Sequence, residues 1–142
     1  MAPDRLLKLL VQGRAREVLS PELSSVRARR PDLVVWLEDG RLFHLELQST
    51  PDPNLDWRML EYYLIFRRDL RVEPEQIVLF VGREPLRRAG IIEEAALRFR
   101  YKVIYIRDLP AEEMLASESL SDNLIAILCG TQDPESVVRR IL

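Results

Sequence analysis

The segment QIVLFVG, residues 76–82, constrains the fold more than any other, because no polar residue interrupts it from Ile77 to Val81. A strand with this pattern is buried on both faces, as in a sheet that helices cover on both sides. A second such strand is predicted over residues 102–107, KVIYIR, with a helix over 86–99 between the two. The pattern therefore predicts an α/β fold in which helices flank both faces of a central mixed β-sheet.

Helical periodicity and capping residues predict the remaining elements. The spacing of leucine and valine favours a first helix over residues 3–19, with Pro3 in its first turn and Pro21 after its end. Residues 24–30 are weakly strand-like, and the segment 55–69, which lacks glycine and proline, is predicted to be a helix. Further helices are predicted over 110–117, over 121–128 and from residue 134 onward.

The length of 142 residues fits one domain over residues 1–142, with enough chain for a single core. Its last residues lie inside an amphipathic pattern, which indicates either a docked last helix or the start of a longer parent chain.

No apolar run reaches the ~18 residues of a membrane span, and the N-terminus resembles an amphipathic helix more than a signal peptide. We therefore expect a cytoplasmic protein that does not bind membranes. Cys129 is the only cysteine, which excludes an internal disulfide and a cysteine-rich zinc site.

The charge pattern leaves two interpretations open. The net charge of −2 argues against a protein that coats nucleic acid nonspecifically. All but two of the 21 basic residues are arginine, however, and several of them cluster: Arg27, Arg29 and Arg30; Arg67, Arg68 and Arg71; Arg83, Arg87 and Arg88. These clusters are either solvated surface or local phosphate-binding sites, since a guanidinium group matches a phosphate in a bidentate way.

The segment RRPDLVVWLEDGRLFHLELQST, residues 29–50, predicts a β-hairpin with strands over 32–37 and 41–48. A two-residue turn would put Asp32 and Glu46 on opposite faces. A three-residue loop with Gly40 in the left-handed position pairs residue 37 with 41, and Asp32 with Glu46. This second register is favoured, because it separates an apolar face from a face that is polar at one end and carries Asp32, His44, Glu46 and Gln48.

Two carboxylates directly opposite each other, with Cβ atoms ~4.5–5.5 Å apart, repel unless a cation lies between them. Asp32 and Glu46, together with the backbone carbonyl of Leu47, offer oxygen ligands that suit Mg²⁺ or Mn²⁺. Such an ion can activate a water and neutralise charge on a phosphodiester. The alternative interpretation is structural, with Asp32 capping a loop and Glu46 paired with an arginine. Spacing alone leaves both open.

The residues PD at 31–32, followed after thirteen residues by ELQ at 46–48, resemble the PD-(D/E)XK nuclease motif, with glutamine in the usual lysine position. The closer resemblance is to its Rpn-type branch, the recombination-promoting, transposase-like nucleases. In that branch the E-x-Q form is familiar, a histidine often precedes the glutamate by two, and an R-M-L-x-Y segment follows. Here these are His44 and Arg58–Tyr62, and the segment 99–117 resembles a further part of the family. The resemblance spans roughly residues 30–120.

The resemblance implies a restriction-endonuclease-like core of the order αβββαβ and Mg²⁺-dependent cleavage of DNA. By position, Asp32 and Glu46 would be metal ligands and catalytic residues, and Gln48 the third catalytic residue. Gln48 brings no positive charge, although its amide can orient a water or donate to a phosphate oxygen. The alternative is a nuclease-fold protein of weak or no activity that binds nucleic acid or a partner. Cleavage of both DNA strands requires two sites, which a homodimer would supply.

Four further residues are candidates for contact with nucleic acid or for support of the ligands: Glu17, His44, Arg58 and Tyr62. His44 would orient a water or contact DNA, although a hydrogen bond beneath a helix is the favoured interpretation. Arg58 and Tyr62, four residues apart on one helical stripe, would grip a phosphate, brace Glu46 and Gln48, or serve the structure alone. Glu17, expected on the first helix, would complete the acidic cluster, as a helix glutamate does in some relatives.

Overall fold

The computed structural model describes residues 4–19, 31–83 and 89–110, which form a central sheet, a separate two-stranded hairpin and two α-helices. The elements are, in chain order, α1 (Asp4–Val11), β1 (Ala15–Val18), β2 (Leu33–Leu37), β3 (Leu42–Gln48), α2 (Leu55–Asp69), β4 (Pro74–Phe80), β5 (Ile91–Glu93), β6 (Arg98–Arg100), β7 (Lys102–Tyr105) and the 3₁₀ turn η1 (Ile106–Asp108). The five-stranded sheet has the order β1-β2-β3-β4-β7, and β5 pairs with β6.

The central sheet is mixed, as predicted. β1, β2 and β3 are antiparallel neighbours, whereas β3, β4 and β7 run parallel. The apolar run from Ile77 to Val81 forms most of β4, which starts and ends two residues earlier than the predicted strand. The strand predicted over 102–107 forms as β7 and continues into η1.

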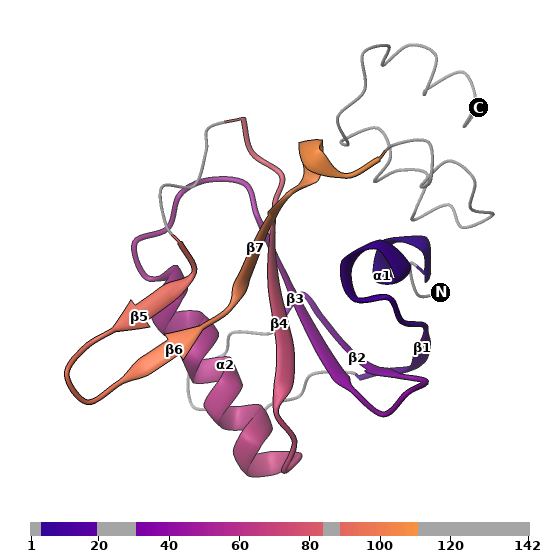
Figure 1. The fold of residues 1–142 in the computed structure, drawn as a ribbon, viewed down its shortest axis with the longest axis horizontal. Helices are drawn as coiled ribbons and strands as arrows, with labels where there is room; N and C mark the ends of the chain where they lie inside the picture. The colour runs from indigo at the N-terminus through magenta and orange to yellow at the C-terminus, as the bar shows by residue number, and fades with distance from the viewer. Residues whose placement is uncertain (1–3, 20–30, 84–88, 111–142) are drawn as a thin grey trace.

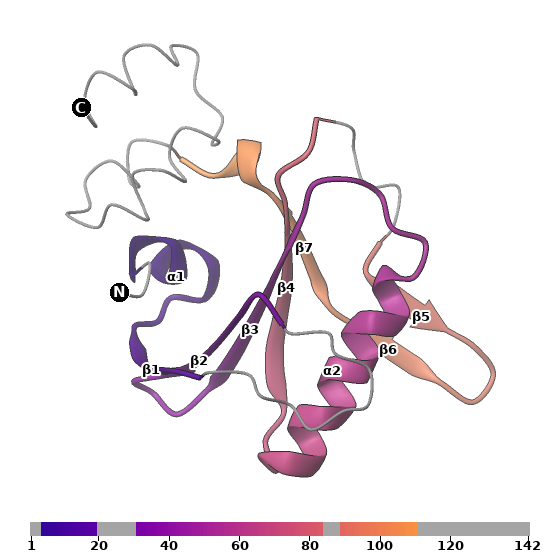
Figure 2. The same cartoon turned by 180° about the vertical axis from the view of Figure 1, so that it is seen from behind.

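The two α-helices cover opposite faces of the sheet, as Figures 1 and 2 show from the front and from behind. The leucines of α1 pack with Ile77 and Leu79 of β4, while α2 packs on Val78 and Phe80. Because successive side chains of a strand point to opposite faces, this alternation confirms that β4 is buried on both sides. The α/β architecture with helices on both faces is therefore present in the described residues.

The first predicted helix was too long. α1 ends at Val11, and Gln12 has a φ of 52°, in the left-handed region that a helix cannot continue through. The close approach of Gly13 to Leu37, whose Cδ1 a Cβ would meet at 2.9 Å, then lets the chain turn back onto the sheet. Residues 15–18 therefore pair with β2 as an edge strand instead of extending the helix.

The helix predicted over 86–99 is wrong for residues 89–99, which contain β5 and most of β6. The local sequence is rich in helix-forming residues, but packing decides the outcome, since Ile92 and Phe99 are buried with Leu55 and Met59 of α2. Gly90, at a φ of 67°, lies so close to Tyr101 that a Cβ would be 2.4 Å from its carbonyl oxygen. The connection between the parallel strands β4 and β7 thus carries a β-hairpin in its described part.

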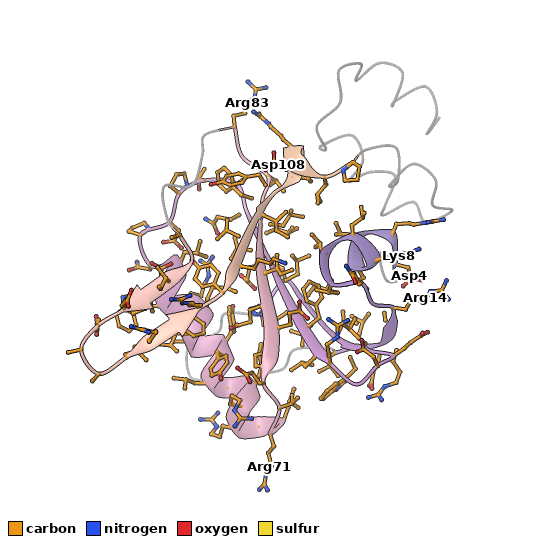
Figure 3. All side chains as sticks on the ribbon, viewed as in Figure 1. Asp4, Lys8, Arg14, Arg71, Arg83 and Asp108 are labelled. Atoms are coloured by element: carbon orange, nitrogen blue, oxygen red, sulfur yellow. The ribbon has the colours of Figure 1, made fainter. Side chains whose placement is uncertain are left out.

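Helix α2 has the predicted bounds. The weakly strand-like residues 24–30 and the helices predicted over 121–128 and from residue 134 lie outside the described residues, as do Cys129 and all of the helix predicted over 110–117 except Pro110. No helix in the described part of the chain is long and apolar enough to cross a membrane. Figure 3 shows Arg71 and Arg83 extending away from the protein at its two ends, so these members of two predicted arginine clusters do not share one surface.

Candidate metal site

The β2–β3 hairpin has the register that the sequence favoured. Leu33 pairs with Leu45, and the Leu37 N–H donates to the Arg41 carbonyl at 2.9 Å. Gly40 has a φ of 89°, which closes the three-residue loop. One residue beyond the last pair, Asp32 lies across from Glu46 at the open end of the hairpin.

Each of the two carboxylates accepts a hydrogen bond from a backbone N–H of the opposite arm of the hairpin. The Leu47 N–H donates to Asp32 Oδ2 at 2.7 Å, and the Asp32 N–H donates to Glu46 Oε1 at 3.0 Å. Each side chain therefore extends the hairpin beyond the point where the strand pairing stops. Asp32 does cap backbone here, and the same contacts fix the positions of both acids.

Three oxygen atoms at this end of the hairpin suit a cation. The second oxygen of each acid, Asp32 Oδ1 and Glu46 Oε2, accepts no hydrogen bond from the residues that the structure describes. The Leu47 carbonyl points to the same side of β3 as its N–H, toward Asp32, because both groups of a strand residue share one side. β2 begins only at Leu33, so the strand ladder ends before this carbonyl.

Partial burial raises the pKa of the Asp32 carboxyl above its ordinary value. The hydrogen bond from the Leu47 N–H opposes this rise, and the nearby charge of Glu46 adds to it. A divalent cation between the two acids would remove the repulsion that contributes to the raised pKa. Metal binding at this site would therefore weaken as the pH falls and Asp32 takes up a proton.

The raised pKa of Asp32 predicts how stability changes with pH. A folded-state pKa above the unfolded value means that the folded chain binds more protons, so this carboxyl becomes destabilising as the pH rises above 3.8. In chelator, we expect Asp32→Asn to raise the melting temperature at pH 7 by about 1–3 °C, a difference that shrinks toward pH 3. Thermal unfolding of both proteins across this range would measure it.

Asp39 provides a control of opposite sign in the same hairpin. A hydrogen bond from the Arg41 side chain lowers the pKa of Asp39, so its ionised form stabilises the fold until the pH falls through that lowered pKa. Asp39→Asn should therefore lower the melting temperature at pH 7. A stability gain at Asp39 as large as that at Asp32 would show that the effect is general charge removal.

Arg58, in the first half of α2, connects Gln48 to two acids. Its Nη2 donates to Gln48 Oε1 at 2.9 Å, its Nη1 to Asp52 Oδ2 at 2.7 Å, and its Nε lies 3.8 Å from Glu46 Oε2. Gln48 Nε2 also donates to the Thr50 carbonyl. Among the described residues Arg58 forms ion pairs with Asp52 and Glu46 but not with Asp32. Within the described part of the chain, Arg58 therefore forms an ion pair with one of the two acids of the hairpin, Glu46.

His44 lies beneath α2 and is fully buried. Its ring makes edge-to-face contacts with Tyr62 and Phe66 at centroid distances of 4.9 and 5.2 Å. Its Nε2 lies 3.0 Å from Glu46 Oε1, and its Nδ1 lies 3.0 Å from Gln76 Nε2. His44 is thus placed to support Glu46 from below, and Tyr62 packs against His44.

Glu17 is not on a helix, contrary to the prediction. It lies on the edge strand β1, paired with Trp36, and is exposed. Two residues that the sequence analysis missed contact the site instead: Asp52 pairs with Arg58, and Gln76 binds His44. The signal for Gln76 was a polar residue at the start of an otherwise apolar buried strand.

Gly82 packs closely against the backbone of the segment that follows Gln48. A Cβ at Gly82 would lie 2.0 Å from the Ser49 carbonyl oxygen and 2.7 Å from Phe80 Cζ, so any side chain forces the backbone to move. We expect Gly82→Ala to lower the free energy of unfolding, measured in urea, by more than about 2 kcal/mol. Gly40→Asn, at a position with open space around the Cβ, should cost on the order of 1 kcal/mol. Equal costs would contradict this account.

The donor set distinguishes between kinds of metal. No group of three or more His, Cys, Asp or Glu side chains that could hold a metal occurs within residues 4–19, 31–83 and 89–110. This argues against a zinc site there, which needs at least three such protein ligands. Two carboxylates and a carbonyl do fit Mg²⁺ or Mn²⁺, which take oxygen ligands and keep several waters.

Comparison with known proteins finds no family model that matches the chain. The curated proteins and the solved structures likewise contain no match.

Proposed function

We propose that the protein is a Mg²⁺-dependent DNA endonuclease with a restriction-endonuclease-like core of the Rpn type. The observation that carries the proposal is the pair of hydrogen bonds that fixes both acids, from the Leu47 N–H to Asp32 and from the Asp32 N–H to Glu46, and that leaves the second oxygen of each acid without a hydrogen bond from the described residues. The order α1, β1, β2, β3, α2, β4 agrees with the αβββαβ core that the motif implies. Mn²⁺ has the same ligand preference and is expected to replace Mg²⁺.

Asp32, Glu46 and the Leu47 carbonyl would hold the ion. When bound, the ion supplies Lewis-acid stabilisation of the charge that develops on a phosphodiester. The chain itself contributes orientation, because the backbone N–H groups of Asp32 and Leu47 fix both carboxylates before any ligand arrives. Such preorganised groups need no rearrangement during the reaction.

Gln48 and Arg58 would act together beside the ligands. Arg58 holds the Gln48 oxygen and the Thr50 carbonyl accepts one amide hydrogen, so the second amide hydrogen has a fixed direction in which it can donate to a water or a phosphate oxygen. The guanidinium of Arg58, 3.8 Å from Glu46 Oε2, supplies the positive charge that Gln48 lacks. Arg58 is therefore the candidate for stabilising negative charge on the phosphate.

A second candidate function is nucleic-acid or partner binding without cleavage. The observation in its favour is that Gln48 is uncharged and already engaged by Arg58 and Thr50. This candidate predicts no cleavage by the natural chain in any metal. Gln48→Lys would then be expected to gain activity, since it places a cation beside the ligands.

The test is nicking of supercoiled plasmid by the full chain in Mg²⁺, Mn²⁺, Ca²⁺ or chelator. Nicking in Mg²⁺ or Mn²⁺ that chelator abolishes is expected for the endonuclease. Absence of nicking in the natural chain, with activity in Gln48→Lys, would favour the second function. Nicking that persists in chelator would contradict a metal-dependent mechanism.

A further inference from the structure

A buried series of hydrogen bonds connects α2, through β4, to the candidate ligand Glu46. Gln76 is buried in β4 and lies opposite His44 in the parallel pairing of β3 with β4. Its Nε2 is 3.0 Å from the Met59 carbonyl of α2 and 3.0 Å from His44 Nδ1. The Met59 carbonyl can only accept a hydrogen bond, so the amide nitrogen of Gln76, and not its oxygen, must face it.

The orientation of Gln76 determines where His44 carries its proton. One amide hydrogen of Gln76 serves Met59, and the other points at His44 Nδ1, which must therefore be the ring nitrogen that accepts. The proton lies on Nε2, which donates to Glu46 Oε1 at 3.0 Å. The ring has little room to reorient, because it is fully buried against Tyr62 and Phe66.

The result is an asymmetric carboxylate at Glu46. Oε1 accepts two hydrogen bonds, from His44 Nε2 and from the Asp32 N–H, whereas Oε2 accepts none from the described residues. A cation that used both oxygens of Glu46 would have to displace these donors. Bidentate carboxylates are common around Ca²⁺, while the smaller Mg²⁺ requires near-octahedral geometry.

We propose that Gln76 is a positioning residue that acts through His44 to present a single oxygen of Glu46, and so favours Mg²⁺ over Ca²⁺. The inference rests on the proposed metal site and extends it to the choice of ion. Without the donor at Nδ1, the His44 proton is free to occupy either nitrogen, and Oε1 becomes available to the larger ion. Residues that orient ligands in this way affect metal affinity by roughly 10–100-fold.

The experiment measures metal affinity rather than cleavage. Binding of Mn²⁺ to the full chain is followed by the loss of the free-ion signal in electron paramagnetic resonance, and Mg²⁺ and Ca²⁺ are titrated as competitors. Gln76→Met keeps the length of the side chain but removes its donors, and we expect it to lower the ratio of Mg²⁺ to Ca²⁺ affinity about tenfold. Circular dichroism and thermal unfolding establish that the variant is folded; if it is not, Gln76→Asn, which keeps an amide but shortens its reach, replaces it.

A double-variant cycle tests whether Gln76 acts through His44. His44→Gln keeps an amide donor for Glu46 Oε1 but has no ring nitrogen that depends on Gln76, so adding Gln76→Met should leave the affinity ratio unchanged. If Gln76→Met weakens both ions equally, or shifts the ratio equally in both backgrounds, the inference is overturned while the metal site stands. If the natural chain does not bind Mn²⁺, or binds it equally after Asp32→Ala, the proposed metal site fails and the inference with it.

Discussion

Replacement of either Asp32 or Glu46 by alanine is expected to lower the rate of plasmid nicking by at least about a thousandfold. Lewis-acid stabilisation by a bound cation contributes several kcal/mol, and each 1.36 kcal/mol corresponds to a factor of about ten in rate. Each variant removes one of the two acids that face the site. Because each acid also accepts a backbone hydrogen bond from the opposite arm of the hairpin, neither can take the position of the other when that acid is lost.

The same contacts require a control for folding. Asp32→Ala removes the acceptor for the Leu47 N–H, which would cost about 1–2 kcal/mol of stability, so rates should be compared well below both melting temperatures. Asp39→Ala is the matched variant, because Asp39 is an exposed acid at the other end of the hairpin, paired with Arg41 at 2.8 Å. It should cleave at the natural rate. Cleavage that survives both site substitutions would place the activity elsewhere or in a contaminant.

The site hairpin could be predicted because its determinants are local. The alternation of apolar and polar residues and the position of Gly40 specify the register, and both lie within one short segment. That register alone brings Asp32 to Glu46. Arg58 was a candidate from its motif, but its contacts depend on the loop between β3 and α2, where Asp52 provides a partner that no periodicity marks.

The sequence-based predictions failed where packing between distant segments overrides the local preference for a helix or leaves no local signal. Residues 91–100 have a helix-like composition, yet Ile92 and Phe99 bury their side chains against α2 as a hairpin. Gln76 is 32 residues from His44, and only the pairing of β3 with β4 brings them together. A sequence pattern with period two identifies a strand but not the strand that pairs with it. The buried series of hydrogen bonds behind Glu46 could therefore not be predicted.

The second large effect is expected at Arg58. Arg58→Gln should lower the nicking rate by about 10²–10³-fold, the range observed when one preorganised donor to transition-state charge is removed. Arg58 is the cation that contacts Gln48, with Nη2 2.9 Å from Gln48 Oε1. Asp52→Asn is the matched control, since it removes the negative charge that pairs with Arg58 at 2.7 Å but leaves the guanidinium, and it should change the rate by less than about tenfold.

Moving the positive charge from residue 58 to residue 48 tests whether Arg58 stabilises charge on the phosphate or only holds Gln48 in place. If Arg58 contributes a positive charge beside Glu46, then adding Gln48→Lys to Arg58→Gln should raise the nicking rate at least about tenfold above that of Arg58→Gln alone. The reason is that an ammonium group then lies next to the same ligands. If Arg58 only braces Gln48, the double variant lacks both partners of that contact and should be no faster than Arg58→Gln. The double variant therefore decides between the two roles with one rate measurement, provided that thermal unfolding shows both proteins to be folded.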